Sequence, residues 1–200
     1  VVEGEPATEI ARFEREQNID LVVMPTRGRG PFRRLLLGSV TAKVLDDSEC
    51  PILTTTHGVE PPPPEPRPYR RVACAVDLGP HSVNVLRWGA GFAAAAGAAL
   101  DVIHAAAPLR AIGDDLGVRF RGLVMDAVQH EIEELLQQAG AEAQIHADSG
   151  DVAECVPKVA AGIGADLLVV GRTSREGLLG RLHANTYALI RSSPCPVASI

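Results

Sequence analysis

Residues 150–171 read GDVAECVPKVAAGIGADLLVVG, and this stretch decides the fold. Asp151, followed by Glu154 three positions later, has the pattern of a capping box that opens a helix. The apolar residues that follow lie on one face of that helix: Val152, Cys155, Val156, Val159, Ala160 and Ile163. Beyond Gly164, the unbroken apolar run at 167–170 is typical of a strand buried on both faces. The stretch therefore predicts a helix followed by a buried strand, which is the unit of an α/β fold.

The same alternation extends to both sides of this stretch. Further strands are predicted at 71–77, 99–105, 141–146 and 196–200, and further helices at 81–96, 119–139 and 185–192. Gly97 and Gly140 stand where two of these helices should stop. Strands that alternate with helices form a parallel sheet with helices on both faces. The prediction for residues 69–200 is a five-stranded, doubly wound parallel sheet of the Rossmann-like type.

An internal repeat extends the prediction to the rest of the chain. Residues 4–10 correspond to 150–156, and 20–24 correspond to 166–170, both at an offset of 146 positions. Cys50-Pro51 corresponds to Cys195-Pro196 at an offset of 145. Residues 1–57 therefore correspond to the C-terminal half of a first copy that lacks its opening strands. We expect either that the chain is a fragment of a longer protein or that another chain supplies the missing half.

A proline-rich segment separates the two copies. Residues 58–68 read GVEPPPPEPRP, a composition typical of a semi-rigid spacer. The prediction is a partial copy at 1–57, a linker at 58–68 and a complete copy at 69–200, with a separate sheet on each side of the linker. The last strands of the two copies, at 51–55 and 196–200, are expected to pair as the edges of a pseudo-dimer, because uncovered edges seek partners.

Composition excludes several classes of protein. With 46% apolar and 22% charged residues the chain has the balance of a globular protein, and a net charge of −6 argues against a nucleic-acid-binding protein. The longest uncharged stretch, at 88–100, is too short to span a membrane. The chain does not open with a signal peptide, so a cytoplasmic location is expected. The four cysteines lack metal-binding spacing and are expected to be free buried thiols.

Cations and glycines gather in residues 25–40, which read PTRGRGPFRRLLLGSV. No acidic residue occurs between Asp20 and Asp46, and Lys43 adds a further cation. Ser39 is predicted to be the N-cap of a helix whose first amides point outward. This combination fits two interpretations, which composition alone does not separate: an anion site, most simply for phosphate, or a solvated basic loop next to a capped helix. The cations of the loop are Arg27, Arg29, Arg33 and Arg34, and its glycines are Gly28, Gly30 and Gly38.

This run resembles the universal stress protein family. Its nucleotide-binding members carry Gly, two residues, Gly, nine residues, then Gly with Ser or Thr. Gly28, nine residues and Gly38-Ser39 match the later elements, and Pro25 departs from the first. Cys-Pro before the last strand and Asp77 after a first strand also look like the family. The resemblance implies an adenine nucleotide, ATP, as ligand, with Mg²⁺ left open. By this resemblance the first copy would bind phosphate and ribose through Arg27, Gly28, Gly38, Ser39 and Val40.

The second copy matches the same family pattern less well. The resemblance places Asp77 and Ala105 on the adenine side of a site, and Gly171 keeps the first glycine. The later elements are replaced by Ser174, Ala184 and Asn185, while Arg172, Arg175 and Arg181 remain as cations. The second copy is therefore predicted to be the degenerate one, with Asp77, Ala105, Gly171, Ser174 and Asn185 as its weaker candidates.

The resemblance implies a nucleotide-binding stress-response or signalling module, with at most weak ATP hydrolysis and self-association through the last strands. A structural or interaction protein without nucleotide, a hydrolase or transferase of the wider fold group, and a regulatory tail of a longer protein remain alternatives. No catalytic residue and no metal ligand is assigned, because the sequence shows no Ser-His-Asp spacing, no G-x-S-x-G elbow and no Walker A lysine. His104 and His146 fall on predicted strands and are expected to be hydrogen-bonded core or edge residues.

Overall fold

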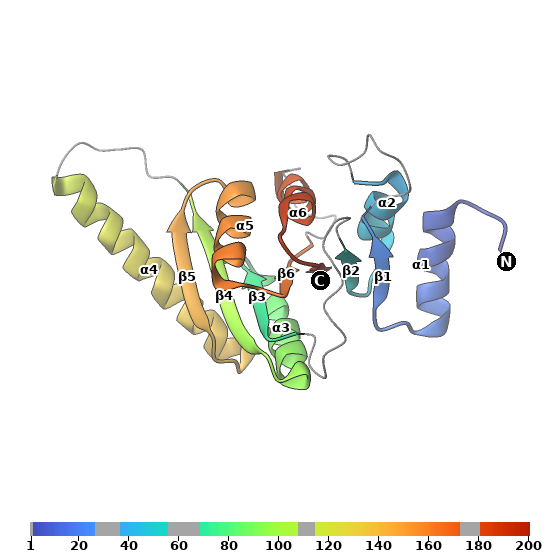
Figure 1. Ribbon diagram of the computed structural model, residues 1–200, viewed down its shortest axis with the longest axis horizontal. Helices are drawn as coiled ribbons and strands as arrows, with labels where there is room; N and C mark the ends of the chain where they lie inside the picture. The colour runs from blue at the N-terminus through green and yellow to red at the C-terminus, as the bar shows by residue number, and fades with distance from the viewer. Residues whose placement is uncertain (1, 27–36, 56–68, 108–114, 173–180) are drawn as a thin grey trace.

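The structure is a computed structural model that describes residues 2–26, 37–55, 69–107, 115–172 and 181–200. The proline-rich segment and most of the two glycine-containing loops, at 27–36 and 173–180, lie outside the described residues. The described chain forms one seven-stranded sheet in the order β1-β2-β7-β6-β3-β4-β5 (Figure 1). Its strands are β1 (Val22–Pro25), β2 (Ile52–Thr55), β3 (Arg71–Ala75), β4 (Ala99–Ala106), β5 (Gln144–Ser149), β6 (Leu167–Val170) and β7 (Val197–Ser199).

The expectation of two separate sheets is wrong, because the last strands of the two halves join them into one. β2 pairs with β7 in antiparallel fashion, with Leu53 opposite Ala198, and all the other pairings are parallel. This is the edge pairing that the sequence predicted, and that prediction is confirmed. Residues 69–200 contribute the five strands β3–β7, and the whole sheet has seven strands rather than five.

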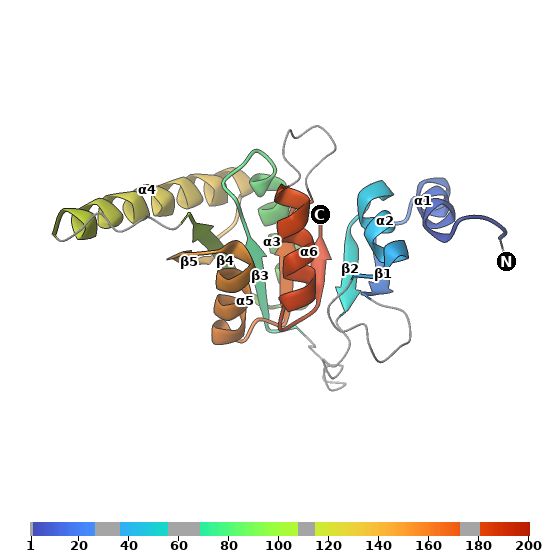
Figure 2. The ribbon, with the colours of Figure 1, turned by 90° about the horizontal axis from the view of Figure 1, so that it is seen from above.

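The helices form two layers. They are α1 (Pro6–Gln17), α2 (Ser39–Asp47), α3 (Ser82–Ala96), α4 (Asp115–Ala139), α5 (Val152–Ile163) and α6 (Arg181–Ser192). α1, α2, α5 and α6 pack on one face of the sheet, around Ile52, Ala73 and Leu168. α3 and α4 pack on the other face, against strand residues such as Val72 and Val169. Seen from the side and from above, α4 and α1 lie at opposite ends of the molecule (Figures 1 and 2).

Several helix boundaries follow the sequence signals. α3 and α5 end at Gly97 and Gly164, both in the left-handed conformation with φ of 66° and 67°. Asp151 caps α5 as predicted, because its side chain accepts a hydrogen bond from the Ala153 N–H at 2.9 Å. β5 begins at Gln144, three residues later than the sequence indicated.

The two halves repeat each other's hydrogen bonds as well as their sequence. The Val22 N–H donates to the Pro51 carbonyl at 3.0 Å, and the Leu168 N–H donates to the Pro196 carbonyl, also at 3.0 Å. The offset between these pairs is the one found in the sequence. The core between the halves is continuous, since Val44 of α2 and Ile190 of α6 belong to one buried cluster.

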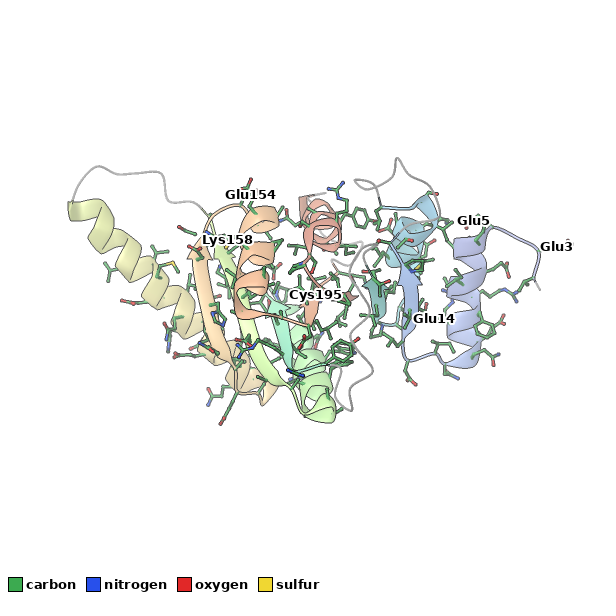
Figure 3. All side chains as sticks on the ribbon, in the orientation of Figure 1. Glu3, Glu5, Glu14, Glu154, Lys158 and Cys195 are labelled. Atoms are coloured by element: carbon green, nitrogen blue, oxygen red, sulfur yellow. The ribbon has the colours of Figure 1, made fainter. Side chains whose placement is uncertain are left out.

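A buried carboxylate organises the end of the first half. Glu14 of α1 is only 3% exposed. Its Oε1 accepts hydrogen bonds from the backbone N–H groups of Glu49 (2.8 Å) and Cys50 (2.5 Å), and its Oε2 accepts from the Ser48 hydroxyl. Figure 3 marks Glu14 on the helix beside β1. Burial alone would raise the pKa of Glu14, but these hydrogen bonds outweigh it and lower that pKa below 4.5.

None of the described helices combines the length and apolar run needed to cross a bilayer. The described part of the chain also contains no cluster of three side chains suited to a metal ion. The four cysteines are free, with Cys74, Cys155 and Cys195 buried and Cys50 half-buried.

Candidate functional site

A cavity of about 170 Å³ opens at the carboxyl ends of β3, β4 and β6. The chain leaves β3 toward β4 and β5 on one side and returns to β6 on the other, so the cavity lies at the point where the strand order reverses. Ligands of open α/β sheets bind at such points. The residues around it include Asp77, His81, Ser82, Val85, His104, Ala105, Val152, Val156, Gly171, Arg172, Asn185, Thr186 and Leu189.

Four of the five candidates predicted for the second copy line this cavity. Asp77 follows β3, Ala105 lies near the end of β4, Gly171 follows β6, and Asn185 is in the first turns of α6. The fifth, Ser174, lies outside the described residues. Residues that are up to 108 positions apart in sequence, from Asp77 to Asn185, therefore meet at one site.

Asp77 is held by the turn that leads into α3. Its Oδ1 accepts hydrogen bonds from the Gly79 N–H at 2.9 Å and from the Ser82 hydroxyl at 3.1 Å. Among the described residues no group donates to Oδ2. The carboxylate is thus fixed by one oxygen and can accept a hydrogen bond from a ligand through the other.

His104 is a cavity residue that sequence reasoning did not select. The ring is buried, with 8% of its surface exposed, and its Nδ1 lies 2.8 Å from the Val76 carbonyl oxygen. Because a carbonyl oxygen only accepts, Nδ1 carries a proton, and the neutral ring has Nε2 as an acceptor. The expectation of a hydrogen-bonded core or edge histidine is confirmed for buried His104 and for His146, which lies on the edge strand β5 with its Nε2 2.7 Å from Asp101 Oδ1. The signal in the sequence for a role of His104 in the site was its position next to Ala105 on β4.

Gly171 has a packing role besides any contact with a ligand. A Cβ at this position would lie 3.3 Å from Cγ2 of Val85, which is tighter than ordinary van der Waals contact. The Gly171 carbonyl accepts a hydrogen bond from the Thr186 hydroxyl at 3.1 Å, which fixes the start of α6 against the end of β6. The equivalent bond in the first half runs from the Thr41 hydroxyl to the Pro25 carbonyl, also at 3.1 Å.

Arg172 does not act as a cation of the second-copy loop, contrary to the sequence interpretation. Its guanidinium turns toward the first half and donates three hydrogen bonds to carbonyl oxygens, those of Leu45 (3.2 Å), Ser48 (2.9 Å) and Cys50 (2.7 Å). Burial lowers the pKa of Arg172, and the nearby Glu14 carboxylate opposes that effect. The Arg172 guanidinium therefore binds carbonyl oxygens at and just after the end of α2 rather than facing the cavity.

Three of the five candidates of the first copy lie at the start of α2. Gly38 is the N-cap in an extended conformation (φ −63°, ψ 142°) without a side-chain cap, and Ser39 and Val40 are the first helical residues. The prediction that Ser39 is the N-cap is therefore wrong by one residue, because the Gly38 carbonyl already accepts the first helical hydrogen bond, from Ala42 at 2.8 Å. Arg27 and Gly28 lie outside the described residues.

Lys43 forms ion pairs with two acidic residues. Its ammonium group lies 2.9 Å from a carboxylate oxygen of Asp47 and 3.8 Å from one of Glu5. Lys43 therefore pairs with one acidic residue of α2 and with the residue that caps α1. Lys43 thus forms ion pairs outside the loop at 25–40, and residues 27–36 of that loop lie outside the described residues.

Comparison with known proteins supports one family throughout. Over 53 residues the chain is 43% identical to Universal stress protein MJ0531 of Methanocaldococcus jannaschii, a match that covers 26% of this chain and only 31% of that relative. The structure resembles a putative universal stress protein from Pseudomonas aeruginosa, with a TM-score of 0.73 and 19% identity over 100% of this chain and 69% of that one. It also resembles a universal stress protein in complex with cAMP, with a TM-score of 0.53 and 23% identity over 66% of this chain and 97% of that one.

The family model described as "Universal stress protein family" matches residues 1–55 and 68–200. The match covers both halves and omits only the proline-rich segment and its immediate flank. The chain therefore belongs to the universal stress protein family.

Proposed function

We propose that this chain is an adenine-nucleotide-binding module of the stress response and that it holds the base of the nucleotide in the cavity between β3 and β6. The observation that carries the proposal is the cavity itself, because it brings together Asp77, Ala105, Gly171 and Asn185 at the switch point of the sheet.

The chemistry of the cavity suits a heteroaromatic base. Val152, Val156 and Leu189 provide apolar walls, and Asp77 and His104 provide hydrogen-bond acceptors for ring or exocyclic N–H groups. A volume of about 170 Å³ is below the ~300–1,000 Å³ of pockets that enclose a whole drug-sized ligand. The cavity therefore accepts the base alone, with ribose and phosphates extending toward the start of α6. The cAMP complex of a structural relative supports this class of ligand.

The first half provides an alternative nucleotide site, in which the loop at 25–40 would bind the phosphate groups. The loop at 25–40 carries four arginines and leads into α2, whose N-cap is a glycine without a competing side-chain cap. Amides at such a helix start bind anions. The phosphate and ribose contacts proposed for the first copy are those of Arg27, Gly28, Gly38, Ser39 and Val40.

Filling the cavity tests the proposed base site. We expect Ala105→Leu to weaken binding of ATP and of cAMP at least about tenfold, which corresponds to ~1.4 kcal/mol, because the added side chain occupies the space of the base. Isothermal titration calorimetry measures the effect. Ala161→Leu is the matched control, since Ala161 is exposed on α5 and away from the cavity lining. Equal affinities for Ala105→Leu and the unmodified protein would refute the base site.

Two double variants distinguish the halves. If the base lies in the second half, Ala184→Gly with Asn185→Ser should strengthen ATP binding, because these changes restore the family's Gly-Ser pair there. Gly38→Ala with Ser39→Asn should then leave affinity unchanged. The opposite result would assign the nucleotide to the first copy, as the residue pattern of the loop at 25–40 predicts. Binding of neither ATP nor cAMP to the unmodified chain would favour the structural or interaction role instead.

A further inference from the structure

The cavity at the carboxyl ends of β3, β4 and β6 has a carboxylate in its lining. Asp77 contributes this group, and its Oδ1 is held by the Gly79 N–H and the Ser82 hydroxyl. Among the described residues that line the cavity, Arg172 is the one lysine or arginine, and its guanidinium is bound to carbonyl oxygens of the first half. The charge that a ligand meets in the described lining is therefore negative.

The rim of the cavity adds further acids. Asp148 of β5 is the register partner of Ala105 on β4, so its exposed side chain lies on the same face of the sheet, one strand spacing of about 4.8 Å away. Burial raises the pKa of Cys155, and the Asp148 carboxylate raises it further, which places that charge beside the start of α5. Asp151 and Glu154 are exposed acids at the same end of α5, where Figure 3 labels Glu154. These acids give the carboxyl edge of the second half a negative potential.

The cations of the second half offset this charge only in part. Lys158 follows Glu154 by one turn of α5 and balances one of the acids (Figure 3). The segment between β6 and α6, of which residues 173–180 lie outside the described part, has Arg175 and Arg181 against Glu176 in its sequence. The loop at 25–40 has four arginines and no acid. The two copies therefore differ in the ligand charge that they suit.

The negative edge favours an uncharged ligand. Carboxylates accept hydrogen bonds from hydroxyl and amino groups, and they repel phosphate. Adenosine offers an amino group and ribose hydroxyl groups without charge, whereas ATP brings a triphosphate. We infer that the second-half cavity selects adenine nucleosides, with affinity falling from adenosine to AMP to ATP. The inference rests on the proposed base site and adds to it the charge of the ligand.

A residue-specific NMR titration tests the inference. Adenosine, AMP and ATP are each titrated into the 200-residue chain in buffer with EDTA, and dissociation constants are taken from the amide shifts of Gly171 and Asn185, which line the cavity. Binding at the loop of the first half would instead shift the amide of Gly38. We expect adenosine to bind the cavity at least about tenfold more tightly than ATP, because the triphosphate lies against the acids of the rim.

Removing one rim charge should narrow this difference. Asp148→Asn keeps an acceptor for the Ser149 N–H, which lies 2.8 Å from Asp148 Oδ1, and removes the charge. We expect it to strengthen ATP binding about threefold or more and to change adenosine binding less than about twofold. Asp20→Asn is the matched control, because Asp20 is also exposed but precedes β1 in the first half.

Salt provides an independent readout. Raising sodium chloride from about 50 to about 300 mM should strengthen ATP binding at the cavity, because screening weakens repulsion between like charges, and should leave adenosine binding unchanged. ATP that binds the cavity as tightly as adenosine, or more weakly as salt is added, would overturn the inference and leave the base site standing. An unchanged ATP affinity in Asp148→Asn would also overturn it. If none of the three ligands shifts the amides of Gly171 and Asn185, the proposed function itself is refuted, and the inference with it.

Discussion

Arg172→Met should lower the free energy of unfolding by about 3 kcal/mol. The substitution removes a charged donor, so three buried or half-buried carbonyl oxygens lose their hydrogen bonds to the guanidinium. The carbonyls of Leu45 and Ser48 belong to the end of α2, where helix carbonyls lack partners within the helix. The guanidinium also adds a positive charge at the negative end of that helix and faces the buried carboxylate of Glu14. Urea denaturation at neutral pH measures the loss.

Arg87 provides the control for this substitution. Its guanidinium also donates to a carbonyl oxygen, that of Gln138 at 3.1 Å, but on an exposed part of the surface. Arg87→Met removes the same side-chain chemistry where water can replace the bond, so we expect little change in stability. A similar effect of the two substitutions would mean that the contact of Arg172 with the first half contributes nothing specific.

The sequence predicts the elements of the fold well because their signals are local. Helix ends at Gly97 and Gly164 follow from a residue type that adopts positive φ readily. The buried strand at 167–170 follows from an unbroken apolar run, and the β2–β7 pairing follows from two similar strands that each end a copy. These predictions needed only near neighbours in the chain or the repeat itself.

The sequence predicts that the last strands of the two copies pair, but not that this pairing produces a single sheet. Pairing of the last strands turns two sheets into one, a consequence that the repeat alone did not make evident. The direction of the Arg172 side chain depends on carbonyls more than 120 positions away. The N-cap of α2 differs from the prediction by one residue because Gly38 adopts the extended capping conformation that the Ser pattern assigned to Ser39.

The sequence interpretation grouped the candidates of the second copy as one site but ranked that site below the loop at 25–40. Asp77, Ala105, Gly171 and Asn185 were weaker candidates from a copy thought to be degenerate, yet they line a single cavity. The stronger match, at 25–40, was based on cations and glycines in sequence order, and residues 27–36 of it lie outside the described residues. A glycine pattern indicates where a backbone can approach a phosphate, whereas this cavity depends on residues from six elements, namely β3, α3, β4, α5, β6 and α6.

Glu14 is the clearest example of a residue that the repeat could have identified. Its counterpart in the second half is Ala160, on the buried face of α5. A carboxylate at a buried position costs free energy unless donors surround it. The N–H groups of Glu49 and Cys50 and the hydroxyl of Ser48 are those donors. The substitution of Ala by Glu within the repeat therefore links α1 to the turn between α2 and β2.

We expect Glu14→Gln to destabilise the protein by about 2 kcal/mol at pH 7, because a neutral amide accepts these hydrogen bonds less strongly and its NH₂ group meets donors. The effect should depend on pH. The pKa of Glu14 in the folded protein is lowered from 4.5, so its ionised form adds stability that is complete above that value. As the pH falls through the lower folded pKa, the carboxylate gains a proton and this contribution disappears.

The difference in unfolding free energy between the unmodified protein and Glu14→Gln should therefore be constant near neutrality and shrink below pH 4.5. Urea titrations at a series of pH values measure this difference. Glu16→Gln is the matched control, because Glu16 lies on the same helix, pairs with Arg12 at 3.0 Å and is exposed. It should change stability little at any pH. A Glu14→Gln effect that is independent of pH would show that shape rather than charge matters at this position. An effect that grows toward acid would mean that Glu14 titrates above its ordinary value, because the cost of burial then exceeds the stabilisation from its three donors.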